Sequence, residues 1–295
     1  MSDTIETLFL RVVEAGSLKA AAEQTGADPS AVSRKLAALE ARLGVKLLNR
    51  STRRSTPTEA GQRYYEGLRR VVDAKAALEA DISGLVDTPT GRLTLAAPVD
   101  FGARFVAPVI GALQERYRDL SVDLRLGSGF DDLAEQGIDV AVRIGRLPDS
   151  SLIARRLGAV PRVIVGSADY LSAHGTPASP SDLAAHDFVF YRPGQRELDI
   201  KAGAQTVTVK GRVSANSITA VRALVAGGRG LHLGPVWAFE AGLADGSLKA
   251  VLSDHALDAF PLHAVYAPSA FVPAKIRAFI DAMAASVKAE ASLER

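Results

Sequence analysis

Residues 28–44 have the sequence DPSAVSRKLAALEARLG, which predicts one amphipathic helix with a marked start and end. Asp28 is a favourable N-cap, and Pro29 suits the first helical position because its missing N–H has no partner there. Gly44 is typical of the residue just beyond a helix. The apolar positions of the helix recur at helical spacing and predict a buried stripe of Val32, Leu36, Leu39 and Leu43. The opposite face begins with Ser30, Ser33, Arg34 and Lys35.

Two shorter helices are predicted before this one. The first contains apolar residues at helical spacing from Ile5 to Val13 and ends at Gly16, and the second extends from Leu18 to Thr25 behind the N-cap Ser17. Helix, short helix, tight turn and helix is the order of a helix-turn-helix domain. A recognition helix enters the major groove by its N-terminal end, which favours short side chains and hydrogen-bond donors there. A generic three-helix domain is the alternative interpretation.

A basic segment follows the three helices. Residues 45–57 predict a β-hairpin that could lie beside the minor groove as a wing. Between Pro29 and Arg70 there are ten basic and three acidic residues, a local net charge of +7, whereas the whole chain carries +2. Such a positive field suits a polyanion because each neutralised phosphate releases counterions. Taken alone, the charge is equally consistent with a solvated basic face.

A long helix is predicted from Glu59, capped by Thr58, to about Leu85. About 27 residues correspond to roughly 40 Å, which is longer than a compact winged helix requires. Six of the seven positions at alternating steps of four and three are apolar, the pattern of a seam between two helices. The apolar members are Tyr64, Leu68, Val71, Leu78, Ile82 and Leu85, and Lys75 is the polar member. A helix packed on its own domain is the alternative.

From residue 89 the pattern changes to alternating strands and helices. A βαβαβ unit is predicted between residues 92 and 144, and a second α/β run begins at Arg162, which indicates parallel sheets covered by helices. Crossovers between the two halves are expected near residues 158–161 and 266–269. In such folds ligands bind outside the carboxyl ends of strands. The residues at these positions are Pro98, Val99, Asp100, Phe101, Ser128, Asn216 and Ser217.

Composition and missing motifs exclude several classes of protein. The chain has 295 residues, 47% of them hydrophobic, and no cysteine, which excludes disulfides and thiolate metal sites. No uncharged apolar run reaches the roughly 18 residues of a membrane span, and the first residues lack a basic signal region, so a cytoplasmic protein is expected. The five histidines lie far apart, and neither a Gly-x-Ser-x-Gly elbow nor a phosphate loop is present. We therefore expect no metal, no cofactor and no enzymatic activity.

The N-terminal motifs resemble the winged-helix signature of the LysR-type transcriptional regulators. The matching stretches are SLKAAA at 17–22, AVSRKL at 31–36, LGVKLLNR at 43–50 and TEAG at 58–61. Looser similarity continues through LTLAAP at 93–98, GIDVAVR at 137–143, DYL at 169–171, AGGRGL at 226–231 and KIRAFID at 275–281. The family commonly has Gln-Pro before the Ala-Val-Ser triplet, whereas this chain has Pro29-Ser30, so one polar candidate for base contact is absent.

The resemblance implies an α + α/β protein. A winged helix-turn-helix domain is expected at 1–58, a linker and dimerisation helix at 59–88, and an effector-binding domain like the periplasmic binding proteins at 89–295. Its subdomain I would comprise 89–160 and 267–295, and its subdomain II 161–266. The family's DNA contacts would correspond here to the recognition helix and the wing, namely Ser30, Ser33, Arg34, Lys35, Arg50, Arg53 and Arg54.

The implied function is regulation of transcription. The protein would bind a pseudo-palindromic operator as a homodimer or homotetramer, respond to a small-molecule effector and act with RNA polymerase. The alternative is a cytoplasmic small-molecule-binding protein or an enzyme on a periplasmic-binding-protein-like fold, with no specific operator. Asp100 departs from the hydroxyl that anion-binding relatives often place near this loop. Its carboxylate could cap the helix that follows this loop and repel an anion, which suggests an effector that is neutral or carries an amine or several hydroxyls.

Overall fold

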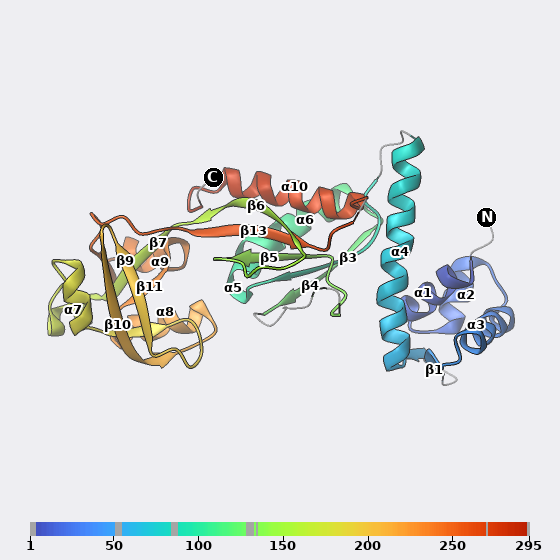
Figure 1. Cartoon of the computed structure of the whole chain (residues 1–295), viewed down its shortest axis with the longest axis horizontal. Helices are drawn as coiled ribbons and strands as arrows, with labels where there is room; N and C mark the ends of the chain where they lie inside the picture. The colour runs from blue at the N-terminus through green and yellow to red at the C-terminus, as the bar shows by residue number, and fades with distance from the viewer. Residues whose placement is uncertain are drawn as a thin grey trace. The chain divides into compact units, whose positions relative to one another are not determined.

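A computed structural model of the chain describes residues 4–50, 55–83, 88–127, 133, 135–269 and 271–293. The side chains of Arg50 and of residues 76, 77 and 80–83 lie outside this description. The chain divides into two compact units (Figure 1). Unit 1 contains residues 1–89, 132–139 and 269–277, and unit 2 contains residues 90–131, 140–268 and 278–295.

Three helices open unit 1, as the sequence predicts: α1 (Ile5–Ala15), α2 (Leu18–Thr25) and α3 (Pro29–Leu43). Each ends at a glycine with a positive φ angle, and the side chains of Thr4, Ser17 and Asp28 accept hydrogen bonds at the three N-termini. The core includes Phe9, Val32, Leu36 and Leu39, whereas Leu43, predicted to extend the buried stripe, is 40% exposed. The stripe therefore ends one turn before the helix does.

A short hairpin follows, formed by β1 (Leu48–Arg50) and the antiparallel strand β2 (Ser55–Pro57). It leads into α4 (Glu59–Ser83), whose first turn is capped when the Thr58 hydroxyl accepts a hydrogen bond from the Gly61 N–H at 3.0 Å. A Cβ atom at Gly61 would lie 1.9 Å from the carbonyl oxygen of Leu47. The glycine of the TEAG motif is therefore needed for the helix to lie directly against the wing.

Unit 2 has two lobes, and the first is built on a five-stranded sheet in the order β4-β3-β5-β13-β6. Its strands are β3 (Gly91–Ala97), β4 (Leu120–Leu126), β5 (Val140–Ile144), β6 (Ile153–Val160) and β13 (Phe260–Tyr266). Strand β3 pairs in parallel with β4 and β5, whereas β13 pairs antiparallel with β5 and β6. Between β3 and β4 lie α5 (Val99–Phe101), a π-helical segment (Gly102–Val106) and α6 (Ala107–Arg116), and α10 (Ala274–Ala289) closes the chain.

The second lobe contains two three-stranded sheets, in the orders β11-β7-β12 and β8-β10-β9. The strands are β7 (Arg162–Ser167), β8 (Asp187–Phe190), β9 (Glu197–Ala202), β10 (Gln205–Ser214), β11 (His232–Pro235) and β12 (Leu248–Val251). The helices are α7 (Ala168–His174), a 3₁₀ segment (Pro180–Ala185), α8 (Ile218–Ala226) and α9 (Val236–Ala244). A core that includes Ile164, Phe188, Phe190 and Leu231 lies between the sheets and α7.

The two lobes are joined by strands, and this changes the predicted topology. Strands β6 and β13 lie side by side where the chain leaves the first lobe and returns to it (Figure 1). They travel in opposite directions and pair antiparallel, so the sheet is mixed rather than parallel. The chain has returned to the first sheet by Phe260, which pairs with Val160 of β6, earlier than the expected crossover at 266–269. Strand β6 was not predicted, because it is exposed over 153–156 and buried over 157–160 and so shows no constant face.

Candidate DNA interface and effector cleft

The N-terminus of α3 is fixed by its own cap. The Asp28 carboxylate accepts hydrogen bonds from the Ala31 N–H at 3.1 Å and from the Ser30 hydroxyl. The bond from Ser30 is the main cause of the lowered pKa of Asp28. Ser30, a predicted DNA contact, thus also helps to order the first turn of the helix on which it lies.

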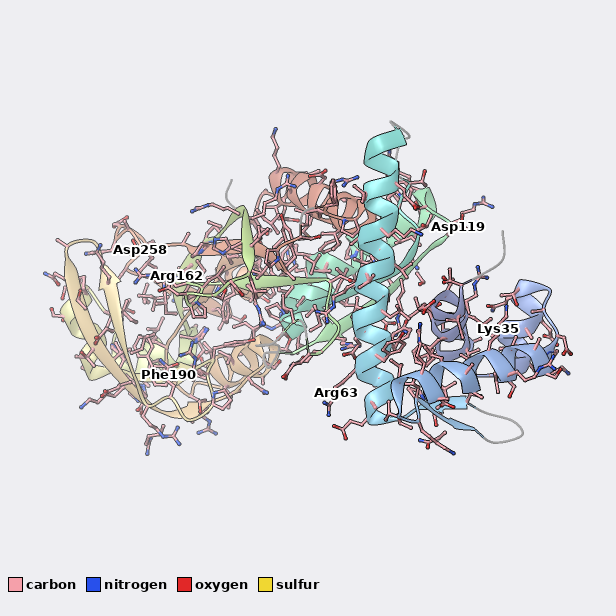
Figure 2. The ribbon with its side chains drawn as sticks, turned by 45° about the vertical axis from the view of Figure 1, so that its right-hand side comes forward. Lys35, Arg63, Asp119, Arg162, Phe190 and Asp258 are labelled. Atoms are coloured by element: carbon pink, nitrogen blue, oxygen red, sulfur yellow. The ribbon has the colours of Figure 1, made fainter. Side chains whose placement is uncertain are left out.

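Arg34 and Lys35 extend from the next turn and are both exposed; Figure 2 labels Lys35. Neither forms an ion pair within the described part of the chain. Ser33, on the same helix, is half-buried. The structure therefore brings the four predicted α3 residues to one short stretch of helix and leaves its two cations exposed.

The wing is described only in part. Arg50 pairs with Ser55 through the backbone of β1 and β2, its side chain lies outside the description, and Arg53 and Arg54 fall outside the described residues. The hairpin is tied to the helices because the Ser55 N–H donates to the Gly16 carbonyl at 2.9 Å. This contact places the start of β2 next to the end of α1.

Several cationic side chains of residues 29–70 are paired or buried, so the local charge of +7 overstates the positive charge that faces solvent. Arg42 is paired with Glu6 at 2.8 Å, Arg63 with Glu59, and Arg69 is buried. The described cations of this segment that are exposed and form no ion pair are Arg34, Lys35, Lys46 and Arg70. The field facing solvent is therefore concentrated on α3 and its neighbours.

The predicted seam along α4 divides into two parts. Tyr64 and Leu68 pack against the core of α1–α3, with the Tyr64 and Phe9 rings 5.4 Å apart. In contrast, Val71 is 65% exposed and Leu78 is 36% exposed, and Lys75 pairs with Glu79 at 3.6 Å. The side chain of Ile82 and the whole of Leu85 lie outside the description. The first two seam positions thus follow the alternative, a helix packed on its own domain.

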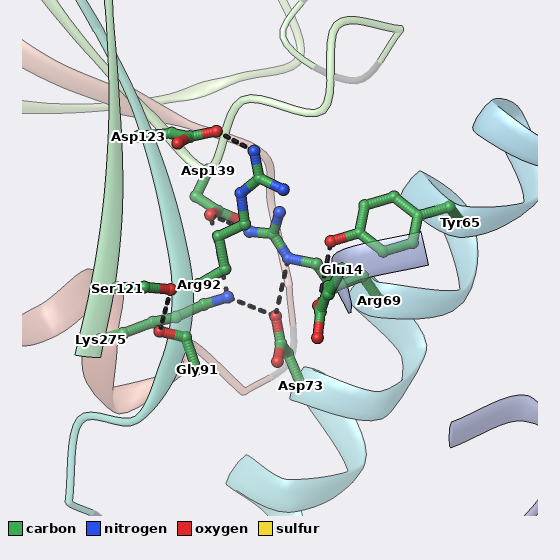
Figure 3. A network of polar contacts seen from close by, with 10 residues as sticks. All are labelled: Glu14, Tyr65, Arg69, Asp73, Gly91, Arg92, Ser121, Asp123, Asp139 and Lys275. Atoms are coloured by element: carbon green, nitrogen blue, oxygen red, sulfur yellow. Dashed lines mark hydrogen bonds and ion pairs between the residues drawn. The ribbon is translucent and has the colours of Figure 1, made fainter. Parts of the chain in front are cut away.

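Further along α4, unit 1 contains a buried charge network (Figure 3). Lys275, with a side chain only 3% exposed, lies 2.5 Å from the carboxylate of Asp73 and 3.8 Å from that of Asp139. Arg69 pairs with Asp139 and lies 3.9 Å from Asp73. Burial raises the pKa of Asp73, and the charges of Lys275 and Arg69 oppose that rise. The network joins α4 to residues 139 and 275, which are far away in sequence.

In unit 2 the decisive contact involves Asp100, at the carboxyl end of β3. Its carboxylate reaches the N-terminus of α8 in the other lobe and accepts from the N–H groups of Ile218 at 2.9 Å and Thr219 at 3.3 Å. The Thr219 hydroxyl donates at 2.6 Å, and the hydroxyl of Ser217, the N-cap of α8, lies 3.3 Å away. Asp100 and Ser217, predicted from separate halves of the sequence, are therefore in direct contact.

These hydrogen bonds stabilise the ionised form of the Asp100 carboxyl. Burial acts to raise the pKa of the carboxyl, but the bonds from Thr219, Ile218 and Ser217 outweigh it and lower the pKa below the ordinary value. The negative charge of Asp100 also acts on Tyr191. Burial raises the pKa of the Tyr191 phenol, and the Asp100 carboxylate raises it further. Asp100 is therefore an ionised group whose acceptor positions are already occupied.

A pocket of about 340 Å³ lies beside this contact. It is lined by Asp100, Ala103, Arg104, Ile218, Thr219, Arg222, Trp237 and Ala238. Arg104 spans the lobes by donating to the Trp237 carbonyl at 2.7 Å and to Glu240 at 2.8 Å. Arg222 is exposed and reaches the Ala238 carbonyl at 3.4 Å. The pocket thus combines an apolar wall with one carboxylate and two guanidinium groups.

The other predicted cleft residues have mixed positions. Phe101 is 1% exposed and packs against Phe105 and Trp237, so it is a core residue and does not line the pocket. Pro98 and Val99 begin α5, Asn216 is exposed just before α8, and Ser128 lies outside the described residues. Sequence reasoning missed Arg104, Thr219 and Arg222. Thr219 and Arg222 lie three residues apart on one face of α8, but neither is at a same-face helical spacing from Ser217, so the sequence held no clear signal for them.

The described residues contain no group of three histidine, aspartate or glutamate side chains that could hold a metal ion. None of the helices they form has both the length and the apolar character needed to cross a membrane.

Comparison with known proteins agrees with this architecture. Residues 7–62 match the family of bacterial regulatory helix-turn-helix proteins of the lysR family, and residues 87–288 match the LysR substrate binding domain. The HTH-type transcriptional activator AaeR of Escherichia coli K12 is 35% identical over 282 residues, covering 94% of this chain and 91% of that protein.

Two solved structures that match nearly the whole chain are also similar. CrgA, a LysR-type transcriptional regulator from Neisseria meningitidis, is 32% identical with a TM-score of 0.59, covering 97% of this chain and 99% of that one. The virulence activator AphB of Vibrio cholerae is 32% identical with a TM-score of 0.57, covering 96% of this chain and 98% of that one. The chain therefore belongs to the LysR family of DNA-binding transcriptional regulators with an effector-binding domain, and it is not an enzyme.

Proposed function

We propose that the chain reads a pseudo-palindromic operator through α3 and the wing, as a dimer or tetramer, and that a small molecule in the cleft of unit 2 controls this binding. The observation that carries the proposal is the exposed pair Arg34 and Lys35 on the first turns of a capped α3. We assign residues 1–58 to DNA binding, 59–88 to dimerisation and 89–295 to effector binding, with a cytoplasmic location.

Each α3 residue has a distinct part in this proposal. The guanidinium of Arg34 suits the paired acceptors on the major-groove edge of guanine, and the hydroxyls of Ser30 and Ser33 allow close approach of the helix. Lys35 supplies a phosphate contact, as Arg50, Arg53 and Arg54 do from the wing. We include RNA polymerase among the partners because the similar protein AaeR is named an activator.

The replacement Arg34→Ala tests this assignment. We expect specific operator affinity to fall by about 1–3 kcal/mol, roughly 5- to 150-fold, because a bidentate base contact is lost. Electrophoretic mobility shift of the native and variant proteins on one operator measures the loss. Arg146→Ala, which removes an exposed arginine from unit 2, is the matched control and leaves affinity unchanged. Equal affinities for the native protein and Arg34→Ala would remove Arg34 from the interface.

The oligomer is proposed to pair through the exposed part of the α4 seam. Val71→Asp places a charge on an apolar position that is not used by its own domain, so it should weaken association without lowering thermal stability. Sedimentation velocity across a concentration series measures the dissociation. Ile153→Asp, at an exposed position on β6, is the control. A dimer equally strong in both variants would place the seam elsewhere.

A further inference from the structure

The contact between Asp100 and α8 joins two lobes that the chain connects at β6–β7 and again between β12 and β13. The acceptor belongs to the loop after β3, and every donor belongs to residues 217–219 of the opposite lobe. The sequence separation is 117 to 119 residues. The bonds therefore exist only when the two lobes are close together.

The donor set has the form of an anion-binding site. Two backbone N–H groups at the start of a nine-residue helix point to the carboxylate, and two hydroxyls complete the shell. Free N–H groups and the helix dipole favour negative charge at such an end. Each oxygen of Asp100 accepts one backbone hydrogen bond, so a small carboxylate of similar size could accept the same donors.

We propose that the N-terminus of α8 is a carboxylate-binding site that the chain fills with its own Asp100, which holds the cleft closed in the absence of a ligand. This inference rests on the proposed function in one respect, namely that the cleft between the lobes is the site of the effector. Because the site is already filled, an effector of the native protein must either displace Asp100 or bind in the adjacent pocket, where Arg222 offers an exposed guanidinium.

Emptying the site should make the protein bind a simple carboxylate. In Asp100→Ala the donors of residues 217–219 lose their acceptor, and acetate can take its place. Acetate is titrated against chloride at equal ionic strength, with thermal stability and Trp237 fluorescence as readouts. Trp237 is the single tryptophan of the chain and lines the pocket beside Asp100. At a tenfold excess over its dissociation constant, acetate should increase the folded-to-unfolded ratio of the variant about elevenfold.

Three other proteins make the result specific. The native chain and Asp100→Asn, in which a side chain still fills the site, should show no saturable response to acetate. Asp182→Ala removes a carboxylate that caps a turn within one lobe, accepting from the Ala178 and Ser179 N–H groups, and should not be rescued by acetate. Asp100→Ser provides a second emptied site if Asp100→Ala does not fold.

A saturable gain in stability and a matching change in Trp237 emission in the emptied variants alone would support the proposal. The same acetate response in the native protein, Asp100→Asn or Asp182→Ala, or no response in either emptied variant, would overturn it. The experiment uses no DNA. Failure here therefore leaves the operator proposal standing, and failure of operator binding leaves this result unchanged.

Discussion

Asp28 and Asp100 perform the same chemistry in two regions of the molecule. Asp28 caps the helix that begins at the next residue, and Asp100 caps α8, more than one hundred residues away in another lobe. Hydrogen bonds lower the pKa of both carboxyls. The cap at α3 fixes a local binding surface, whereas the cap at α8 fixes the relation between two lobes. The same interaction thus serves recognition in one region and closure in the other.

The comparison predicts that a polar contact between distant residues contributes most to global stability where it is buried, and the strongest case is Lys275. Lys275→Met should lower the free energy of unfolding by about 3–5 kcal/mol, because it removes a buried cation that lies within 4 Å of the carboxylates of Asp73 and Asp139. Urea unfolding of the native and variant proteins measures the loss.

The control for Lys275 is an exposed ion pair that also joins distant residues. Arg155 lies 2.7 Å from Asp281, and both side chains are about half exposed. Arg155→Met should therefore cost at most about 1 kcal/mol. If the two variants were equally unstable, burial would not be what distinguishes the network from surface pairs.

His232 provides the next largest effect, through pH. Burial lowers the pKa of its imidazole to about 4, and its Nδ1 contacts the Val189 carbonyl at 2.7 Å, so the buried ring is neutral. Below the ordinary pKa of 6.5 the unfolded chain binds a proton that the folded chain does not. Stability is therefore lost as the pH falls from about 6.5 to 4, by about 3 kcal/mol in total.

Unfolding curves collected across this pH range test the prediction for His232. His232→Asn retains a donor toward Val189 but does not titrate, so the difference between the native and variant unfolding energies should shrink by about 3 kcal/mol toward pH 4. A difference that is constant with pH would show that the imidazole is not held neutral.

The two aspartates can be compared directly. Asp100→Ala should cost about 1–2 kcal/mol in the unfolding of unit 2, because charged hydrogen bonds at a partly exposed site are lost. Asp28→Ala should have a smaller effect, confined to the first turn of α3. Hydrogen exchange measures both: amides across both lobes should lose protection in the first variant, and only those near residue 31 in the second. Loss of protection restricted to residues 217–219 in Asp100→Ala would contradict the comparison.

The carboxylate of Asp100 also gives this contact a pH dependence. Its pKa is lowered in the folded chain, so its stabilising contribution is present above the unfolded value of 3.8 and is lost as the pH falls through the folded value. The difference in unfolding energy between the native protein and Asp100→Asn should accordingly narrow below about pH 4. If this difference in unfolding energy instead widened as the pH falls, the hydrogen bonds to Asp100 would not favour its ionised form.

The same contrast explains what the sequence could predict. The caps at Ser17, Asp28 and Thr58 and the glycines that end the first helices depend on neighbours within a few residues, and all were predicted. Asp100 and Ser217 were each recognised as cleft residues, but a one-dimensional pattern does not contain their pairing. The partners of Lys275 are equally remote, and β6 shows no constant face because it passes from one lobe to the other.

The most direct test of the central claim is selection of genomic fragments by the purified full-length protein, followed by footprinting of the selected sites with the native protein and with Arg34→Ala. The account predicts a few sites, each protected over two half-sites related by two-fold symmetry and about one helical turn apart, with protection lost in the variant. Fragments bound without sequence preference, with affinity governed by salt alone and equal for both proteins, would contradict it.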